Sequence, residues 1–204
     1  MKLLKITCSL IFALSISASV NAQALTDIKK IDFTNFTHRV KTVSVKIKNG
    51  LQVGSCSKDD EGSPTGEIWN VDKENIAYGD LDGDGKAEAI VPMTANICGA
   101  NMLTDEAVLV YTLKGGKATK LPEFEYSDDA CEAGTEDCNL NRVPGVIVEY
   151  DVETKAIAVS NYFATEDDAR CCPSFLRKSW FRWDKTKFVE LKKGKIEASK
   201  QEEL

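Results

Sequence analysis

The chain has 204 residues, of which 43% are hydrophobic and 28% are charged, and its formal net charge is −6. This length suits one domain, and the apolar fraction excludes a disordered chain. The excess of acids argues against a nucleic-acid partner, because neutralising phosphates requires a basic face.

The N-terminal segment has the pattern of a secretory signal peptide. Lys2 and Lys5 form a short positive region, an apolar run follows from about residue 6 to 16, and small residues lead to Ala22. The run is too short for a membrane-spanning helix, which needs roughly 20 residues. We therefore predict cleavage after residue 22, or two residues later, and export to the periplasm or beyond the cell.

Cleavage changes the composition of the working protein. It removes two lysines and no acid, so the net charge becomes −8, and it removes Cys8. No later run is long and apolar enough to span a bilayer. We expect residues 23–204 to form one secreted domain with a short polar C-terminal tail.

Six cysteines remain in the exported chain, and an even number in an oxidising compartment predicts disulfides. They are Cys56, Cys98, Cys131, Cys138, Cys171 and Cys172. Six cysteines allow 15 pairings, which the sequence alone does not resolve. A zinc site is disfavoured, because the chain has no Cys-x-x-Cys and no pair of histidines.

Spacing nevertheless favours a scheme of three bridges. Cys131–Cys138 would close a short polar loop, and Cys56–Cys98 would close a longer loop and stabilise the fold by about 4 kcal/mol. A vicinal bridge between Cys171 and Cys172 would be strained, because adjacent Cα atoms lie only ~3.8 Å apart. Pairing of one of these two with Cys98 therefore stays open.

Short strand-like segments recur along the chain with turn signals between them, beginning with an alternating segment and an Asn-Gly turn. We predict strands over 41–48, 51–53, 74–78, 87–93, 107–113, 118–121, 146–150, 156–163, 179–183 and 187–191. No long helical period occurs, and one short helix is expected near 165–170. The fold class is therefore mainly β, a single-domain antiparallel meander. A sandwich, an open barrel and a partial propeller all fit, whereas the lack of a clear repeat argues against a full propeller.

The most distinctive motif is an Asp/Gly-rich loop between the third and fourth predicted strands. Its acids occupy loop positions 1, 3, 5 and 9, a spacing that supplies oxygen ligands for Ca²⁺. The predicted ligands are Asp80, Asp82, Asp84, the carbonyl of Lys86, and Glu88. The alternative is an Asp/Gly turn without a metal, since these residues favour turns by themselves. We expect the ion to brace the loop structurally.

The loop departs from an EF-hand, because position 12 is Val91 instead of a bidentate Glu and both flanks are strand-like. It resembles instead the calcium loops of FG-GAP and integrin-type β repeats. That resemblance covers about ten residues and implies a calcium-filled β-hairpin.

Four stretches together resemble a group of uncharacterised bacterial exported proteins and lipoproteins. They are Ile31–Thr37, the D-L-D-G-D-G loop within Tyr78–Val91, the Cys-Cys-Pro-Ser segment at 171–174, and the aromatic segment Trp180–Asp184. The resemblance spans about residues 31–191 and implies an envelope location and a small β domain, but no reaction. The acidic insert containing Cys131 and Cys138 departs from the group's pattern.

Catalytic signatures are weak. His38 is the only histidine, no nucleophile elbow occurs, and oxidised cysteines cannot act as thiolates. We therefore assign no catalytic residue. Trp180, Phe181 and Trp183 alternate along one predicted strand and are expected to serve as core and edge cover.

An acidic stretch at 121–141 contains seven acids and no base. They are Glu123, Glu125, Asp128, Asp129, Glu132, Glu136 and Asp137. A solvated loop is the simpler interpretation, and a docking face for a basic partner or a second weak cation site is the alternative.

The sequence thus predicts an exported, non-enzymatic binding module, stabilised by disulfides and braced by calcium. Its partner would be a protein or polysaccharide of the cell envelope, or a basic enzyme that it inhibits. A small envelope hydrolase using surface carboxylates, and a purely structural envelope protein, are the competing hypotheses.

Overall fold

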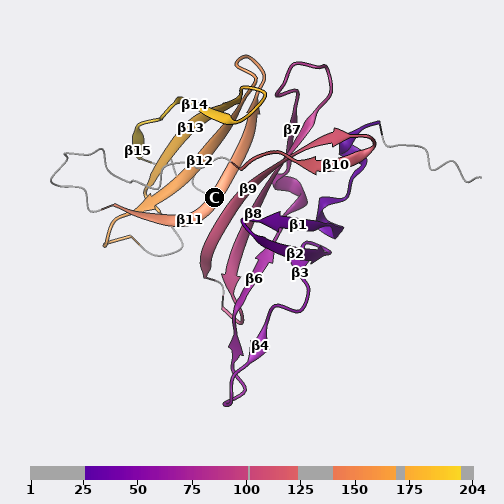
Figure 1. Cartoon of the computed structure of the whole chain (residues 1–204). Coiled ribbons are helices and arrows are strands. Elements are labelled where there is room, and N and C mark those ends of the chain that lie inside the picture. The colour runs from indigo at the N-terminus through magenta and orange to yellow at the C-terminus, as the bar shows by residue number, and fades with distance from the viewer. Residues whose placement is uncertain (1–25, 101, 124–139, 169–172, 199–204) are drawn as a thin grey trace, which may run out of the picture.

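The computed structural model describes residues 26–100, 102–123, 140–168 and 173–198, and its regular secondary structure is almost entirely antiparallel strands (Figure 1). The larger sheet contains, in order, β1 (Thr37–Val40), β2 (Val43–Lys48), β3 (Leu51–Gln52), β6 (Glu67–Asn70), β8 (Glu88–Ile97), β9 (Leu103–Lys114) and β10 (Lys117–Lys120), with β7 (Ala77–Gly79) also paired to β8. The smaller sheet contains β11 (Asn141–Asp151), β12 (Ala156–Ala164), β13 (Phe175–Trp183) and β14 (Phe188–Lys192), with β15 (Ile196–Ala198) also paired to β13.

The remaining elements are small. β4 (Ser57–Lys58) and β5 (Pro64–Thr65) pair in a projecting finger, and the three short 3₁₀ turns are η1 (Ile28–Lys30), η2 (Phe33–Asn35) and η3 (Lys73–Asn75). No helix in the described ranges is long and apolar enough to cross a membrane.

The predicted fold class is confirmed: the chain is mainly β and antiparallel. Each predicted strand segment overlaps an observed strand, whereas β1, β4, β5, β6 and β15 were not predicted. The short helix expected near 165–170 is not seen in its described part, because residues 165–168 form a turn.

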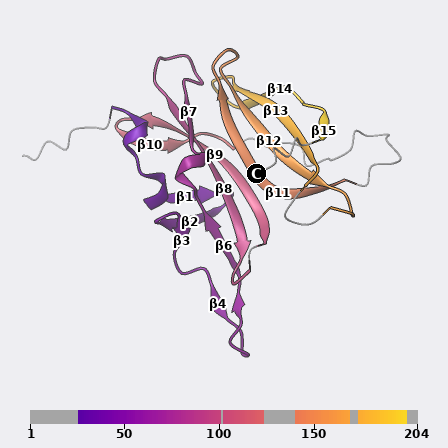
Figure 2. The same cartoon turned by 180° about the vertical axis from the view of Figure 1, so that it is seen from behind.

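The larger sheet curls until its two ends approach each other. The Lys120 ammonium donates to the carbonyl of Arg39 at 2.8 Å, and the backbone N–H of Lys41 donates to Glu123 at 3.1 Å. The sheet is therefore nearly closed and barrel-like, and the smaller sheet packs beside it in both views (Figures 1 and 2).

Strands β8 and β9 lie between two hydrophobic cores. Val91 and Leu109 face a core inside the curled sheet, together with Phe33 and Val45, whereas Ile90, which precedes Val91, faces the smaller sheet. Burial on both faces explains why 89–93 is a continuous apolar run. The loop that precedes β8 is consequently held at the junction of the two sheets.

Candidate functional site

The Asp/Gly-rich loop joins β7 to β8 and is fixed from within. Leu81 is buried in the core between the sheets, so the loop is anchored by its second residue. Gly83 and Gly85 have φ of 81° and 85°, which a residue with a side chain adopts only at a cost. These glycines turn the chain tightly enough to bring acids on both sides of the turn together.

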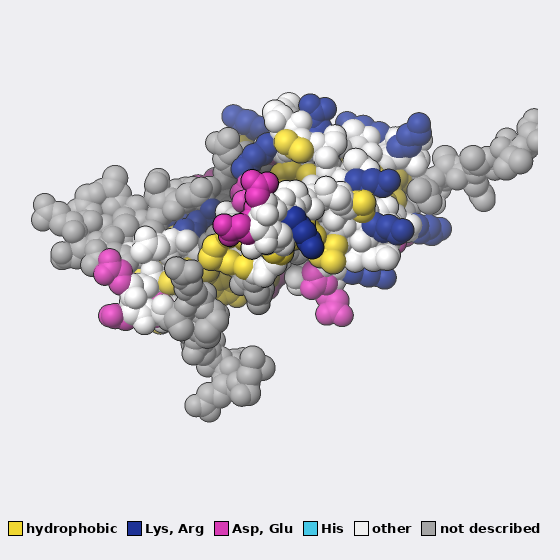
Figure 3. Space-filling model, turned by 90° about the horizontal axis from the view of Figure 1, so that it is seen from below, with side chains coloured by type: hydrophobic (Ala, Val, Ile, Leu, Met, Phe, Trp, Pro, Cys, Tyr) yellow, Lys and Arg dark blue, Asp and Glu magenta, His cyan; other side chains and the backbone are white. Residues whose placement is uncertain are grey.

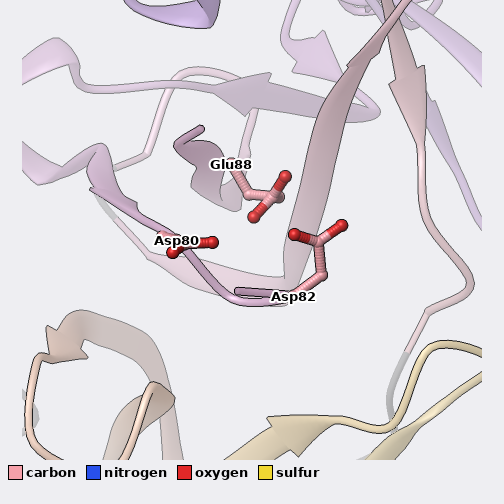
Figure 4. Close-up of side chains that lie close together, drawn as sticks. All are labelled: Asp80, Asp82 and Glu88. Carbon is pink, nitrogen blue, oxygen red and sulfur yellow. The ribbon is translucent and has the colours of Figure 1, made fainter. Parts of the chain in front are cut away.

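Three of the predicted ligands form one cluster. Carboxylate oxygens of Asp80, Asp82 and Glu88 all lie within 4.8 Å of one another, and Figure 4 shows the three side chains arranged around a common space. Oxygens that are each 2.3–2.6 Å from one Ca²⁺ lie within about 5 Å of each other. The spacing of the cluster is therefore compatible with a shared cation.

Glu88 is the buried member of the cluster and the first residue of β8. Its two carboxylate oxygens accept hydrogen bonds from the backbone N–H of Leu81 at 2.9 Å and from the hydroxyl of Thr112 at 3.0 Å. Burial raises the pKa of Glu88, and the nearby charges of Asp82 and Asp84 raise it further, although the two hydrogen bonds oppose this. A bound cation would favour the ionised carboxylate and offset this cost.

Asp80 connects the loop to the smaller sheet. Its carbonyl accepts a hydrogen bond of 2.9 Å from the Tyr150 hydroxyl, and its carboxylate lies 3.3 Å from the Lys155 ammonium. Burial raises the pKa of Asp80, but hydrogen bonds from Lys155 and Gly83 outweigh this effect and hold it below its ordinary value. Tyr150 and Lys155 lie on β11 and in the turn after it, so sequence spacing could not have revealed them.

The fourth predicted carboxylate, Asp84, lies differently. Asp84 does not belong to the cluster: one carboxylate oxygen accepts the Lys86 backbone N–H at 2.7 Å, and the other lies 3.5 Å from the Lys86 ammonium. Lys86 itself is exposed. The described geometry thus brings together three of the four predicted carboxylate ligands.

One predicted disulfide is present. Cys56 and Cys98 are bonded, with Cα atoms 5.7 Å apart, and the bridge joins the base of the β4–β5 finger to the end of β8. The other four cysteines, Cys131, Cys138, Cys171 and Cys172, lie outside the described residues, as do all the acids of the 121–141 stretch except Glu123. Glu123 pairs with Lys120 within the chain.

His38 is fully buried and its ring nitrogens are satisfied. Nε2 lies 2.8 Å from the carbonyl of Phe33, which can only accept, so Nε2 carries the proton and Nδ1 accepts from the Tyr111 hydroxyl at 2.9 Å. Burial lowers the pKa of His38 and raises that of Tyr111, which keeps both groups neutral. This histidine belongs to the core.

The aromatic residues of β13 also have the expected structural placement. Phe181 is buried between the sheets, and Trp183 packs against Phe188 with ring centroids 4.9 Å apart. Trp180 points to the other face, where the Lys192 ammonium lies 5.0 Å from its ring centroid.

Comparison with known proteins adds no relative: no family model, no curated protein and no solved structure matches this chain.

Proposed function

We propose that this protein is an exported, non-enzymatic binding module whose Asp80–Glu88 loop holds a structural calcium ion. The observation that carries the calcium proposal is the convergence of three carboxylates within 4.8 Å, one of them buried. Three negative charges this close repel one another, and a divalent cation would reverse that repulsion. Magnesium fits less well, because it demands a near-octahedral shell and keeps its waters.

The position of the loop indicates what the ion would do. The loop contacts the smaller sheet through Tyr150 and Lys155, while Glu88 begins the central strand β8. Calcium would therefore brace the junction of the two sheets. An extracellular-type affinity of roughly 10⁻⁴–10⁻³ M is expected, which suits a site that is filled constantly and does not act as a sensor.

Thermal unfolding tests the calcium proposal. With that affinity, about 10 mM calcium stabilises the fold by about 1.4–2.7 kcal/mol, which raises the melting temperature by roughly 3–10 °C, and EDTA reverses the rise. Asp82→Asn should abolish the shift while keeping the acceptor for the Asp84 N–H. Asp59→Asn is the matched control, because Asp59 is an exposed turn aspartate that accepts two backbone N–H groups elsewhere. An unchanged melting temperature in wild type would refute the proposal.

Export and partner binding need their own test. The N-terminal segment supports export, and the Cys56–Cys98 bridge is consistent with an oxidising compartment. The exported chain should begin at residue 23 or 25, which intact mass measures. Affinity capture from envelope extract, with calcium and with EDTA, should enrich one envelope component reproducibly. Retention of the uncleaved chain in the cytoplasm would contradict the proposal.

A further inference from the structure

A basic surface stands out on this acidic protein. Residues 33–58 contain five Lys and Arg and no Asp or Glu, although the whole chain has a net charge of −6. Figure 3 shows Lys and Arg gathered on the side of the molecule where Figure 1 places β1, β2, β3 and β10. The charge of this surface is therefore opposite in sign to the net charge of the chain.

Strand register places three of these cations on the outer face of the sheet. Val45 and Ile47 point into the core, so the alternate residues of β2, including Lys46 and Lys48, point outward. On β1, Arg39 pairs with the outward Ser44. Arg39, Lys46 and Lys48 make no ion pair or side-chain hydrogen bond with the described residues, so their charges face solvent.

Two large aliphatic side chains lie beside Lys46 and Lys48, on the neighbouring strand β3 and just after it. Leu51 is directly opposite Lys48, and Val53 follows two residues later on the same face, with its N–H bonded to the Lys46 carbonyl at 2.9 Å. Leu51 and Val53 are 53% and 51% exposed. We call these five residues, Arg39, Lys46, Lys48, Leu51 and Val53, the outer basic face.

We propose that the outer basic face docks this protein onto an anionic lipid surface. Basic side chains near such a surface each strengthen binding by about fivefold, and aliphatic side chains among them enter the headgroup region. A soluble polyanion would gain from the cations but would leave Leu51 and Val53 in water. The combination therefore favours a bilayer, and the proposal is independent of the calcium loop.

Vesicle co-sedimentation of the full chain tests this proposal. The measured quantity is the ratio of affinities for vesicles with about 30% phosphatidylglycerol and for pure phosphatidylcholine vesicles. EDTA is present throughout, so that calcium cannot bridge the acidic loop to lipid. All variants share the N-terminal segment, so differences among them report the described domain. Wild type should prefer the anionic vesicles, and the preference should weaken with salt.

Three variants locate the binding surface. Lys46→Gln/Lys48→Gln should lower the preference by roughly 25-fold, from two cations at about fivefold each. Lys185→Gln/Lys195→Gln removes the same charge from exposed sites on the smaller-sheet side. This variant should change the preference for anionic vesicles less than threefold. Leu51→Ser/Val53→Ser should abolish the binding that persists at high salt. Unchanged melting temperatures confirm that each variant is folded.

The outcomes separate the alternatives. Equal losses in the two lysine variants, or no preference for anionic vesicles in wild type, would overturn the proposal. Tight binding of dextran sulfate without vesicle binding would assign the face to a soluble polyanion and would overturn it as well.

Discussion

The hydroxyl of Tyr150 donates a hydrogen bond of 2.9 Å to the carbonyl oxygen of Asp80, the first residue of the acidic loop. These residues are 70 positions apart, and the bond ties the loop that follows β7 of the larger sheet to β11 of the smaller sheet. The ring of Tyr150 also covers Gly79, which immediately precedes the loop. The acidic cluster is therefore positioned by the contact between the sheets and not by its own turn alone.

Gly79→Ala should destabilise the fold through this contact. A Cβ at this position would lie 2.1 Å from Cγ of the Tyr150 ring, so the ring must move out of the junction. We expect a loss of about 1–3 kcal/mol in the free energy of unfolding, measured by urea denaturation. The double variant Gly79→Ala/Tyr150→Ala should lose less than the sum of the single variants. Strict additivity would show that the ring and the glycine do not compete for space.

Lys155→Met should tighten calcium binding. The Lys155 ammonium lies 3.3 Å from the Asp80 carboxylate and over the loop, so it competes with a cation for the same charge. Its removal should raise calcium affinity by about two- to fivefold, the range expected for an exposed ion pair. Titration calorimetry measures the change, with Lys185→Met as the control. A weaker affinity in Lys155→Met would mean that the lysine supports the site.

His38 should make the fold less stable in mild acid. Its folded pKa lies below the unfolded value of about 6.5, so between those values the unfolded state binds the proton and the folded state does not. The free energy of unfolding should fall as pH drops below about 6.5, by at most about 1.4 kcal/mol per pH unit. The difference in the free energy of unfolding between wild type and His38→Gln, measured from pH 7 to 5, isolates this contribution. A difference that is independent of pH would contradict the assignment.

Removal of the observed disulfide should cost stability. The bridge spans 42 residues, for which the chain-entropy model gives about 4 kcal/mol, and measured losses are commonly 2–5 kcal/mol. Cys56→Ser/Cys98→Ser should lose a comparable amount in urea denaturation. The single variant Cys56→Ser should expose one additional reactive thiol after unfolding. Unchanged stability would indicate that the bridge is not formed in the native protein.

Sequence periodicity identified most strands but failed in β1, where one inward residue is polar, and in β4, β5, β6 and β15, which have no fully buried residue. In β1 the buried positions are His38 and Val40, and the burial of His38 depends on Tyr111, which is 73 residues away. The alternation of apolar and polar residues is therefore hidden. The apolar run of β8, in contrast, was visible because both of its faces are buried.

The acidic site was predictable as a set of residues but not in its geometry. Spacing alone treats the three aspartates alike, whereas the fold groups Asp80 and Asp82 with Glu88 and turns Asp84 toward Lys86. Asp82 and Asp84 are oriented by backbone N–H groups two residues further along the turn. Asp80 is also oriented by Lys155, and that contact forms only when the sheets pack.

Equilibrium dialysis against radioactive calcium measures occupancy of the loop itself. Wild type should bind one ion per chain with a Kd of roughly 10⁻⁴–10⁻³ M, and this binding should be lost in Asp82→Asn and kept in Asp59→Asn. Asp84→Asn should weaken binding less than Asp82→Asn, because Asp84 lies outside the cluster. Uptake of no calcium by wild type, or equal uptake by wild type and Asp82→Asn, would contradict the account.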